Sequence, residues 1–485
     1  MKKIKSVIIL LLVVILCTAC QSTSDRKQTE DTNTILDPSS LVTISLWHYY
    51  SGAQQEAFNG LVEEFNQTKG KEIGVFVKAS NHGNVTELAE SVQAAVDGKV
   101  GASEMPNIFA AYTDTAYEID KKGVLADLSQ YMTTKEQEEY IDSYIEEGRF
   151  SKDNSLKIWP IAKSTEIFAI NKTDWDKFAA ATQSKLSECK TIEGVTNIAK
   201  KYYEWTDSLT PEPNDGKAFY GRDSMSNYFV IGSKQLGEDI VAVDKDKATV
   251  NFTRENAEKL WNNYYVPYIK GYFAASGRFR SDDVKTGSII AFTGSSSGAT
   301  FLPKEVIVND AQSYKIDMKV MEAPKFKDGK DYAVQQGAGM VVTAADEKQV
   351  YASVQFLKWF TDSKRNKEFS IDSGYLPVKK EANDVEEIGE FTKNHEKIVM
   401  DVVERAIQTV NNNQLYTMEV FEHANDVRKV LDYSLADKAD QDRAVVIQNL
   451  QSGMTLPQAV ALFENEENFN SWYQDVSMQL EQLVQ

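Results

Sequence analysis

Cysteine and histidine are scarce in this chain of 485 residues, which holds three cysteines and four histidines. Only Cys189 lies beyond the first 20 residues, and one thiol forms neither an internal disulfide nor a cysteine-rich metal site. No histidine has another histidine three or four residues away, as a helical zinc motif would need. The sequence therefore predicts no metal and no cofactor. The polar neighbours of Cys189 predict a surface position without a special role.

Positive charge is also in deficit, since 53 lysines and arginines stand against 72 acidic residues. Nucleic acid is therefore not an expected partner, because phosphate backbones bind to basic surfaces. After the N-terminus, no apolar run approaches the ~20 residues of a membrane-spanning helix. The hydrophobic share of 42% supplies sizeable cores, and the length predicts two to four domains or lobes.

The N-terminus predicts export from a bacterial cell. Lysines at positions 2, 3 and 5 precede ten apolar residues, Val7 to Leu16, and then Cys17-Thr-Ala-Cys20. This apolar run suits a secretory signal rather than a membrane span. The small residues before Cys20 resemble a bacterial lipobox, although Cys17 stands where that motif normally has leucine. We expect a signal peptide over 1–19, a lipidated Cys20 and a flexible tether over 20–41; an ordinary signal peptide cut nearby is the alternative.

The body of the chain alternates strand and helix patterns. Val42-Thr-Ile-Ser-Leu46 alternates apolar and polar residues, and apolar residues then recur at helical spacing from Ala57 to Phe65. Similar pairs follow, which predicts an α/β fold with mostly parallel strands. Residues from about 380 to 485 read as nearly all helical, with Thr455 at one helix start.

Motifs for catalysis are weak. Gly294-Ser-Ser-Ser-Gly298 matches the nucleophile elbow of hydrolases, with Ser296 as the nucleophile, but a run of small residues matches that pattern easily. The downstream histidines His395 and His423 lie in charged stretches that indicate solvent-exposed helix. We therefore expect no enzyme and keep a Ser296 hydrolase as a remote alternative.

Aromatic residues gather where strands are predicted to end. In open α/β sheets, ligands bind at the carboxyl ends of the strands, and a flat ring packs well against the C–H face of a sugar. The pattern favours a ligand site over simple core filling for the set Trp47, Tyr49, Tyr50, Tyr112, Trp159, Tyr220, Tyr228 and Tyr375.

Several segments in order resemble the extracellular solute-binding proteins, family 1, of ABC importers. They begin with Ile44 to Asn66 and include Met105-Pro-Asn-Ile108, Trp159-Pro-Ile161 and Ser373-Gly-Tyr-Leu-Pro377. The resemblance covers about 42–380. It implies a two-lobe fold of the type II periplasmic-binding-protein class, with a helical C-terminal part, whose lobes close over a ligand.

By matching segments, the resemblance assigns 42–160 and 292–342 to lobe 1, and 166–290 and 344–485 to lobe 2. It implies a monomeric, lipid-anchored receptor on the outer face of the membrane. Such a receptor catalyses nothing and delivers a sugar or oligosaccharide to the permease subunits of an importer.

The ligand remains open between a carbohydrate and a phosphate ester. Ser164, Thr165, Ser295, Ser296, Gly337 and Tyr375 resemble contacts of the glycerol-3-phosphate-binding branch. Here no tryptophan follows Gly221, and no late arginine stands near Leu415 to Glu419. Arg222 or Arg278 is the substitute charge for a phosphate. The expected ligand contacts are Trp47, Tyr49, Tyr50, Tyr112, Ser164, Thr165, Arg222, Ser295, Ser296, Gly337 and Tyr375.

Overall fold

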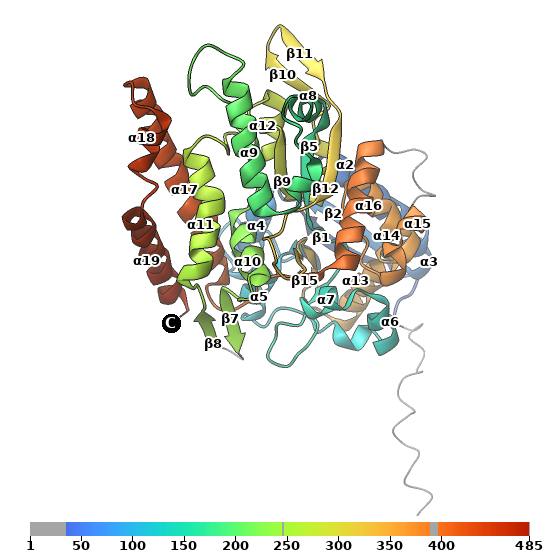
Figure 1. Cartoon of the computed structure of the whole chain (residues 1–485). Coiled ribbons are helices and arrows are strands. Elements are labelled where there is room, and N and C mark those ends of the chain that lie inside the picture. The colour runs from blue at the N-terminus through green and yellow to red at the C-terminus, as the bar shows by residue number, and fades with distance from the viewer. Residues whose placement is uncertain (1–34, 245–246, 389–395, 485) are drawn as a thin grey trace, which may run out of the picture.

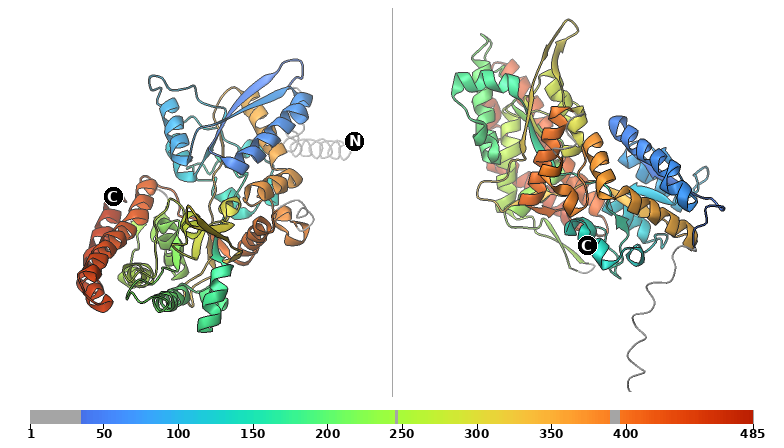
Figure 2. Two further views of the ribbon diagram at one scale, coloured as in Figure 1. Left: turned by 90° about the horizontal axis from the view of Figure 1, so that it is seen from above. Right: turned by 90° about the vertical axis from the view of Figure 1, so that its right-hand side faces the viewer.

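The computed structural model describes residues 35–244, 247–388 and 396–484. The predicted signal peptide, Cys20 and His395 lie outside these ranges. Within them, no helix is both long and apolar enough to cross a membrane. Figure 1 shows the chain from the side of the second lobe, and Figure 2 shows the two lobes, with lobe 1 in blue.

Lobe 1 is built on a five-stranded sheet in the order β2-β1-β3-β14-β4. The first three strands run parallel, and β14 runs antiparallel to both of its neighbours. The strands are β1 (Val42–His48), β2 (Val75–Asn81), β3 (Ile108–Ala111), β4 (Ile158–Trp159) and β14 (Gly339–Val342). The helices are α2 (Gly52–Gln67), α3 (Lys69–Ile73), α4 (Val85–Val96), α5 (Thr113–Asp120), α6 (Thr134–Glu139), α7 (Asp142–Glu146), α13 (Glu347–Phe360) and α14 (Ser363–Ser373), with the 3₁₀ turn η2 (Ser129–Tyr131).

Lobe 2 is built on a four-stranded sheet in the order β12-β5-β9-β6, in which only β6 and β9 run parallel. The expectation of mostly parallel strands is therefore wrong for this lobe. The strands are β5 (Glu166–Asn171), β6 (Tyr220–Arg222), β9 (Ala291–Ser295) and β12 (Met318–Glu322). Small hairpins add β7 (Val241–Asp244), β8 (Lys247–Val250), β10 (Glu305–Asn309) and β11 (Gln312–Lys315).

Helices cover both faces of the lobe 2 sheet, so β5 is buried along its whole length. Phe168 and Ile170 enter one core and Ile167 and Ala169 enter the other, as the alternation of side chains along a strand requires. The helices and 3₁₀ turns are α8 (Lys172–Thr182), η3 (Leu186–Lys190), α9 (Ile192–Asp207), α10 (Met225–Gln235), α11 (Arg254–Ile269), α12 (Arg280–Thr286), η4 (Ser296–Phe301) and α16 (Lys397–Asn412).

The assignment of 292–342 to lobe 1 needs correction. β9 and β12 both flank β5 in the lobe 2 sheet, and only β14 of that range enters the lobe 1 sheet. The range 344–485 divides in the same way, because α13 and α14 contribute Phe356, Phe360 and Phe369 to the core of lobe 1. The resemblance therefore assigned β9 and β12 to the wrong lobe.

Three segments cross between the lobes side by side. Lys163 exchanges two backbone hydrogen bonds with Leu376, and Ser164 exchanges two with Gln336. Next to them, β13 (Tyr332–Val334) pairs with β15 (Gln414–Tyr416). The third crossing also includes η5 (Lys380–Asn383) and α15 (Val385–Ile388). These crossing segments form one hydrogen-bonded hinge.

The C-terminal helices belong to lobe 2. They are α17 (Ala424–Gln451), α18 (Leu456–Ala461) and α19 (Glu466–Leu483), and Thr455 caps α18 as predicted. Leu431 and Leu435 of α17 and Trp472 of α19 are buried in the lobe 2 core. Figure 1 shows α17 beside α11 on the outer side of the lobe.

The end of the predicted tether is packed rather than free. Leu36 contacts the lobe 1 core, and the carbonyl of Asp37 lies so close to Gly74 that a Cβ there would be 2.4 Å away. Gly74 has φ +76°, a conformation that glycine adopts without strain. The predicted tether over 20–41 is therefore too long at its C-terminal end, where Leu36 and Asp37 pack on lobe 1.

Candidate functional site

A cavity of about 220 Å³ lies between the lobes and is lined from both of them. We call it the inter-lobe cavity. Its lining is mostly small, neutral and polar, with few apolar side chains. Lobe 1 contributes Tyr112, Thr113, Asp114 and Glu147, and lobe 2 contributes Ser224, Ser226 and Asn227. The hinge adds Gln335 and Gln336, and the chain before and within α17 adds Thr417, Met418, Val420, Ala424 and Arg428.

Asn227 connects lobe 2 to the hinge at this cavity. It lies in the first turn of α10, where Ser224 caps the helix by accepting from the Asn227 amide. Its side-chain amide donates to Glu166 Oε1 at 3.1 Å and to Gln336 Oε1 at 3.0 Å. The side chain is buried and held at both ends, so it is positioned before any ligand arrives.

A buried ion pair fixes the lobe 1 side. Lys163 Nζ lies 2.6 Å from Glu147 Oε2 and donates to the Gly337 carbonyl at 2.8 Å. The other Glu147 oxygen accepts from Thr113 at 2.9 Å. The charge of Glu147 is therefore already compensated inside the protein. Gly337 itself has φ +103°, and a Cβ there would lie 2.9 Å from the Ala162 carbonyl, so its role is in the backbone of the hinge.

Four tyrosines predicted as ligand contacts lie together at the carboxyl ends of β1 and β3 and after α14. The hydroxyls of Tyr49 and Tyr375 are 3.5 Å apart, and Tyr50 packs against both rings. Burial raises the pKa of Tyr49 and of Tyr112, and the neighbouring Tyr375 raises both further. These phenols stay protonated and retain O–H donors for a ligand. Only Tyr112 of the four lines the inter-lobe cavity.

The tyrosine cluster also meets lobe 2. The Tyr375 hydroxyl interacts with Ser297, and Gln54 Nε2 donates to the Ser297 carbonyl at 3.0 Å. Ser295 caps the short helix η4 by accepting from the Ser297 amide. The small residues of this predicted site therefore serve as a contact between the lobes next to the hinge.

Asp223 follows β6 directly, at the carboxyl edge of the lobe 2 sheet. Burial raises the pKa of its carboxyl group to about 6, although the Arg280 amide donates to it at 2.8 Å. A Cβ at Gly294 would lie 2.2 Å from Asp223 Oδ2, so glycine is required for this approach. The side chain retains 26% exposure and can still reach a ligand.

Arg222, proposed from the sequence as a phosphate contact, is neutralised internally. Its Nη2 lies 2.8 Å from Glu166 Oε2, and its guanidinium stacks over Tyr228 at 5.1 Å. Arg278, the other substitute, contacts only Phe279 among the interactions of the described residues. Neither arginine lines the inter-lobe cavity.

Other predicted contacts are structural. Trp47 is 6% exposed and stacks on His82 with ring centroids 4.0 Å apart. Ser164 pairs with Gln336 through its backbone. Ser296 is fully buried, and its hydroxyl accepts from the Thr165 amide at 3.3 Å. Within the described residues no histidine is hydrogen-bonded to Ser296, which is not the arrangement of an activated nucleophile.

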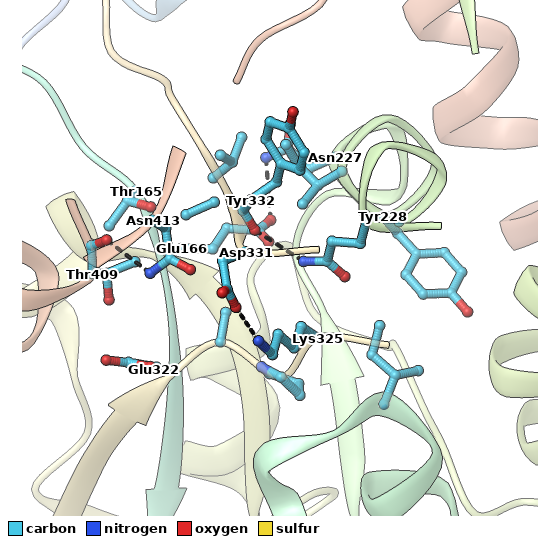
Figure 3. Close-up of a pocket in the computed structure, with 18 of the residues that line it drawn as sticks. Thr165, Glu166, Asn227, Tyr228, Glu322, Lys325, Asp331, Tyr332, Thr409 and Asn413 are labelled. Atoms are coloured by element: carbon cyan, nitrogen blue, oxygen red, sulfur yellow. Dashed lines mark hydrogen bonds and ion pairs between the residues drawn. The ribbon is translucent and has the colours of Figure 1, made fainter. Parts of the chain in front are cut away.

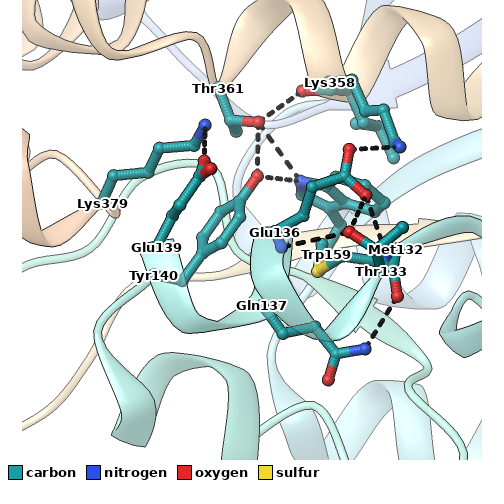
Figure 4. Close-up of polar contacts among 11 residues, drawn as sticks. Met132, Thr133, Glu136, Gln137, Glu139, Tyr140, Trp159, Lys358, Thr361 and Lys379 are labelled. Carbon is teal, nitrogen blue, oxygen red and sulfur yellow. Dashed lines mark hydrogen bonds and ion pairs between the residues drawn. The ribbon is translucent and has the colours of Figure 1, made fainter.

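Three more of the eight strand-end aromatics, Trp159, Tyr220 and Tyr228, are buried core residues. Trp159 is 1% exposed, and its indole N–H donates to the Tyr140 hydroxyl at 3.1 Å. Figure 4 shows that Thr361 completes this network. Tyr228 donates to the Leu260 carbonyl within lobe 2. Cys189 is also fully buried, contrary to its predicted surface position, and burial raises the pKa of its thiol to about 12.

A second, larger cavity of about 550 Å³ lies within lobe 2 behind the crossing segments, and we call it the hinge cavity. Thr165 and Arg222 line it, together with the start of α10, the chain from Met321 to Lys325 and the end of α16. Figure 3 shows these side chains, with the Lys325–Asp331 pair at the front. Asn227 lines both cavities and separates them.

Sequence reasoning missed most of the inter-lobe lining. Asn227 and Gln336 carry no motif, and Arg428 lies beyond the segment in which a late arginine was sought. Arg428 donates to the Thr417 hydroxyl at 3.1 Å, and no carboxylate is paired with it within the described residues. Among those residues, no cluster of three or more potential ligands is arranged for a metal.

Comparison with known proteins adds a family and a fold. The family model described as bacterial extracellular solute-binding protein matches residues 60–397, more than half of the chain. A search of curated proteins gives no match.

Solved structures similar to this chain share its fold at low identity. The cyclic alpha-maltosyl-1,6-maltose binding protein from Arthrobacter globiformis has a TM-score of 0.64 at 17% identity, covering 90% of this chain and 100% of its own. UgpB from Mycobacterium tuberculosis, in complex with glycerophosphocholine, has a TM-score of 0.64 at 18% identity, covering 92% and 100%. Lmo0181 from Listeria monocytogenes, in complex with cycloalternan, has a TM-score of 0.63 at 17% identity, covering 91% and 100%. These structures cover 90 to 92% of the chain, so the similarity of fold extends beyond residues 60–397 that the family model matches.

Proposed function

The chain belongs to the bacterial extracellular solute-binding proteins, and from this premise we propose that it is the receptor of an ABC importer that binds a neutral carbohydrate between its lobes. The observation that carries the proposal is the inter-lobe cavity, which both lobes line with hydroxyl and amide groups. Such groups hydrogen-bond sugar hydroxyls, and the phenol rings beside them suit the apolar face of a sugar.

The charges at the cavity favour a neutral ligand. Glu147 is paired with Lys163, and Arg222 is paired with Glu166 outside the cavity. The remaining charged side chains of the lining are Asp114 and Arg428, of opposite sign. An anionic ligand would gain little from this balance. The similar structures that bind cyclic alpha-maltosyl-1,6-maltose and cycloalternan support the same ligand class.

A phosphate ester is the second candidate, and Arg428 is the observation that favours it. Its guanidinium lines the cavity without a carboxylate partner among the described residues and suits an oxyanion. The relative in complex with glycerophosphocholine is consistent with this reading. The candidate is weaker because the carboxylate of Asp114 lines the same cavity and would repel a phosphate.

Catalysis is not part of the proposal. The Ser296 hydroxyl is buried and engaged by a backbone amide, and the Tyr49, Tyr112 and Tyr375 phenols are held protonated by burial. We propose that the chain acts as a monomer, carries its lipid on Cys20 and works at the outer face of the membrane. The permease reads the closed form of the two lobes.

The test is a binding screen of the protein from residue 35 onward. Neutral disaccharides and oligosaccharides are compared with glycerol 3-phosphate by calorimetry and thermal melting at low and high salt. We expect a neutral sugar to bind without turnover and to stabilise the protein by ~2.7 kcal/mol at 100 times its Kd. Its affinity should hardly change with salt, because no charge pair forms.

The substitution Arg428→Gln separates the two candidates. It should lower the affinity for a neutral sugar only a few-fold, and it should abolish binding of a phosphate ester. Binding of glycerol 3-phosphate alone, with an affinity that falls steeply with salt and is lost in R428Q, would overturn the carbohydrate proposal.

A further inference from the structure

The hinge cavity is larger than the inter-lobe cavity and has no role in the proposed function. Its walls come from lobe 2 and from the crossing segments, and no residue of lobe 1 lines it. At about 550 Å³ it falls in the size range of sites for small organic molecules. It is therefore a site of its own rather than one end of the inter-lobe cavity.

Its lining has an unusual charge balance for a chain of net charge −19. The lining contains four basic and three acidic residues. Two basic residues are paired with two acidic ones, as Arg222–Glu166 and Lys325–Asp331. The remaining side chains are Lys190 and Arg405 against Glu322, none of which has an ion pair with another described residue. The cavity therefore carries an excess of positive charge in an acidic protein.

Arg405 contributes to this lining from α16. Its Nε is buried and has no hydrogen-bond partner among the described residues, while the side chain as a whole remains half-buried at the cavity. The lining also includes the apolar side chains of Ile231, Met321 and Val334. The cavity thus offers an apolar surface and a cationic one to the same molecule.

We propose that the hinge cavity binds a small organic anion, with its carboxylate or phosphate on Arg405 and Lys190 and its apolar body against Ile231 and Val334. The shared chemistry is one oxyanion on a compact apolar group. The proposal does not depend on which solute the inter-lobe cavity binds, so the two proposals fail separately.

The position of the cavity also couples this ligand to the hinge. Thr165 and Val334 belong to two of the segments that run between the lobes, and both line the cavity. Movement of the lobes changes the arrangement of these segments, so an anion that binds one arrangement better shifts the balance of open and closed forms. Its affinity should then differ between the free protein and the protein saturated with its solute.

The test uses benzoate and phenyl phosphate as probes and benzyl alcohol as the neutral control. Calorimetry on the wild-type protein should show one site for each anion and none for the alcohol. Arg405→Gln should weaken anion binding about tenfold or more, through loss of a charge-assisted contact. Arg428→Gln, on the inter-lobe cavity, should leave anion binding unchanged.

Ala323→Phe is a second variant that does not touch charge. Ala323 lines the cavity and is half-buried, so a phenyl ring there takes up space that the anion needs. Retention of the melting temperature in the absence of probe shows that each variant is folded. No binding of either anion at 10 mM, or binding lost in R428Q and kept in both R405Q and A323F, would overturn the proposal.

Discussion

Asp223 shows how one carboxyl group can give the protein a pH dependence. It directly precedes Ser224, which lines the inter-lobe cavity, and burial raises its pKa to about 6 from an ordinary value of 3.8. A raised folded-state pKa means that its contribution to stability is complete below pH 3.8 and is lost as the pH rises through about 6. The same ionisation turns the group into a stronger acceptor for sugar hydroxyls.

We therefore predict that solute affinity rises a few-fold from pH 5 to pH 7, while the free energy of unfolding relative to D223N falls. Calorimetry and urea unfolding across this range measure both effects. The variant Asp282→Asn, altered at an exposed carboxylate nearby, is the control and should follow the wild-type profile. A D223N protein with the same pH dependence as the wild type would contradict this assignment.

Lys163 gives a prediction for stability at the residue scale. Lys163→Met leaves Glu147 buried without its cation, which should cost ~3–5 kcal/mol of unfolding free energy. Lys172→Met removes an exposed partner of Asp176 and should cost ~0–1 kcal/mol. Urea unfolding of the two variants makes the comparison. Equal losses of unfolding free energy in the two variants would contradict the prediction that the buried ion pair stabilises the protein more than the exposed one.

At the scale of elements, the sequence predicted where strands and helices lie along the chain better than it predicted which strands pair in a sheet. The alternation of Val42 to Leu46 became a strand and the helical spacing from Ala57 to Phe65 became a helix, because side-chain period and burial are local properties. The sheet of each strand is a long-range property. β9 pairs with β5 across more than 100 residues of chain, and nothing in Ala291 to Ser295 records that partner. The lobe assignment failed for this reason.

Contacts between elements of different lobes supply a second test. Lys121, after α5 in lobe 1, lies 3.3 Å from Glu422, before α17 in lobe 2. This exposed pair should add less than ~1 kcal/mol to stability, but it forms across the cleft. We predict that Glu422→Gln speeds solute dissociation a few-fold in stopped-flow measurements and barely changes the melting temperature.

Lys122→Gln is the matched control for this pair. Lys122 lies next in the chain and pairs with Asp97 inside lobe 1, 3.2 Å away, so its loss should not affect dissociation. Equal dissociation rates in E422Q and K122Q would mean that the contact across the cleft does not hold the lobes together.

At the scale of the whole molecule, the ordered motifs predicted two lobes, while the binding surface was only partly accessible to sequence reasoning. The predicted set includes Tyr112, which lines the inter-lobe cavity, because aromatic residues at strand ends carry a local signal. Asn227 and Arg428 were missed because their position at the cleft depends on how α10 and α17 pack on the sheet. The sequence of a helix predicts which of its faces is buried, but it does not predict which element its polar face contacts.

The crossing segments determine how the whole molecule should respond to its solute. Since they are hydrogen-bonded to one another through Lys163, Ser164 and Gln336, they bend as one hinge rather than independently. A solute that contacts both lobes binds the closed form better, and a ~10⁴-fold preference is enough to convert an almost fully open population into an almost fully closed one. We predict that a saturating neutral sugar lowers the radius of gyration measured by X-ray scattering.

Asn227→Ala supplies the control for this measurement, because it removes a cavity side chain that joins lobe 2 to the hinge. The variant should bind the sugar poorly and keep the radius of gyration of the free protein at the same sugar concentration. If calorimetry shows tight binding to the wild type while scattering shows no contraction, the sugar occupies a preformed pocket. The permease would then have no closed form to recognise, and the receptor would need another signal.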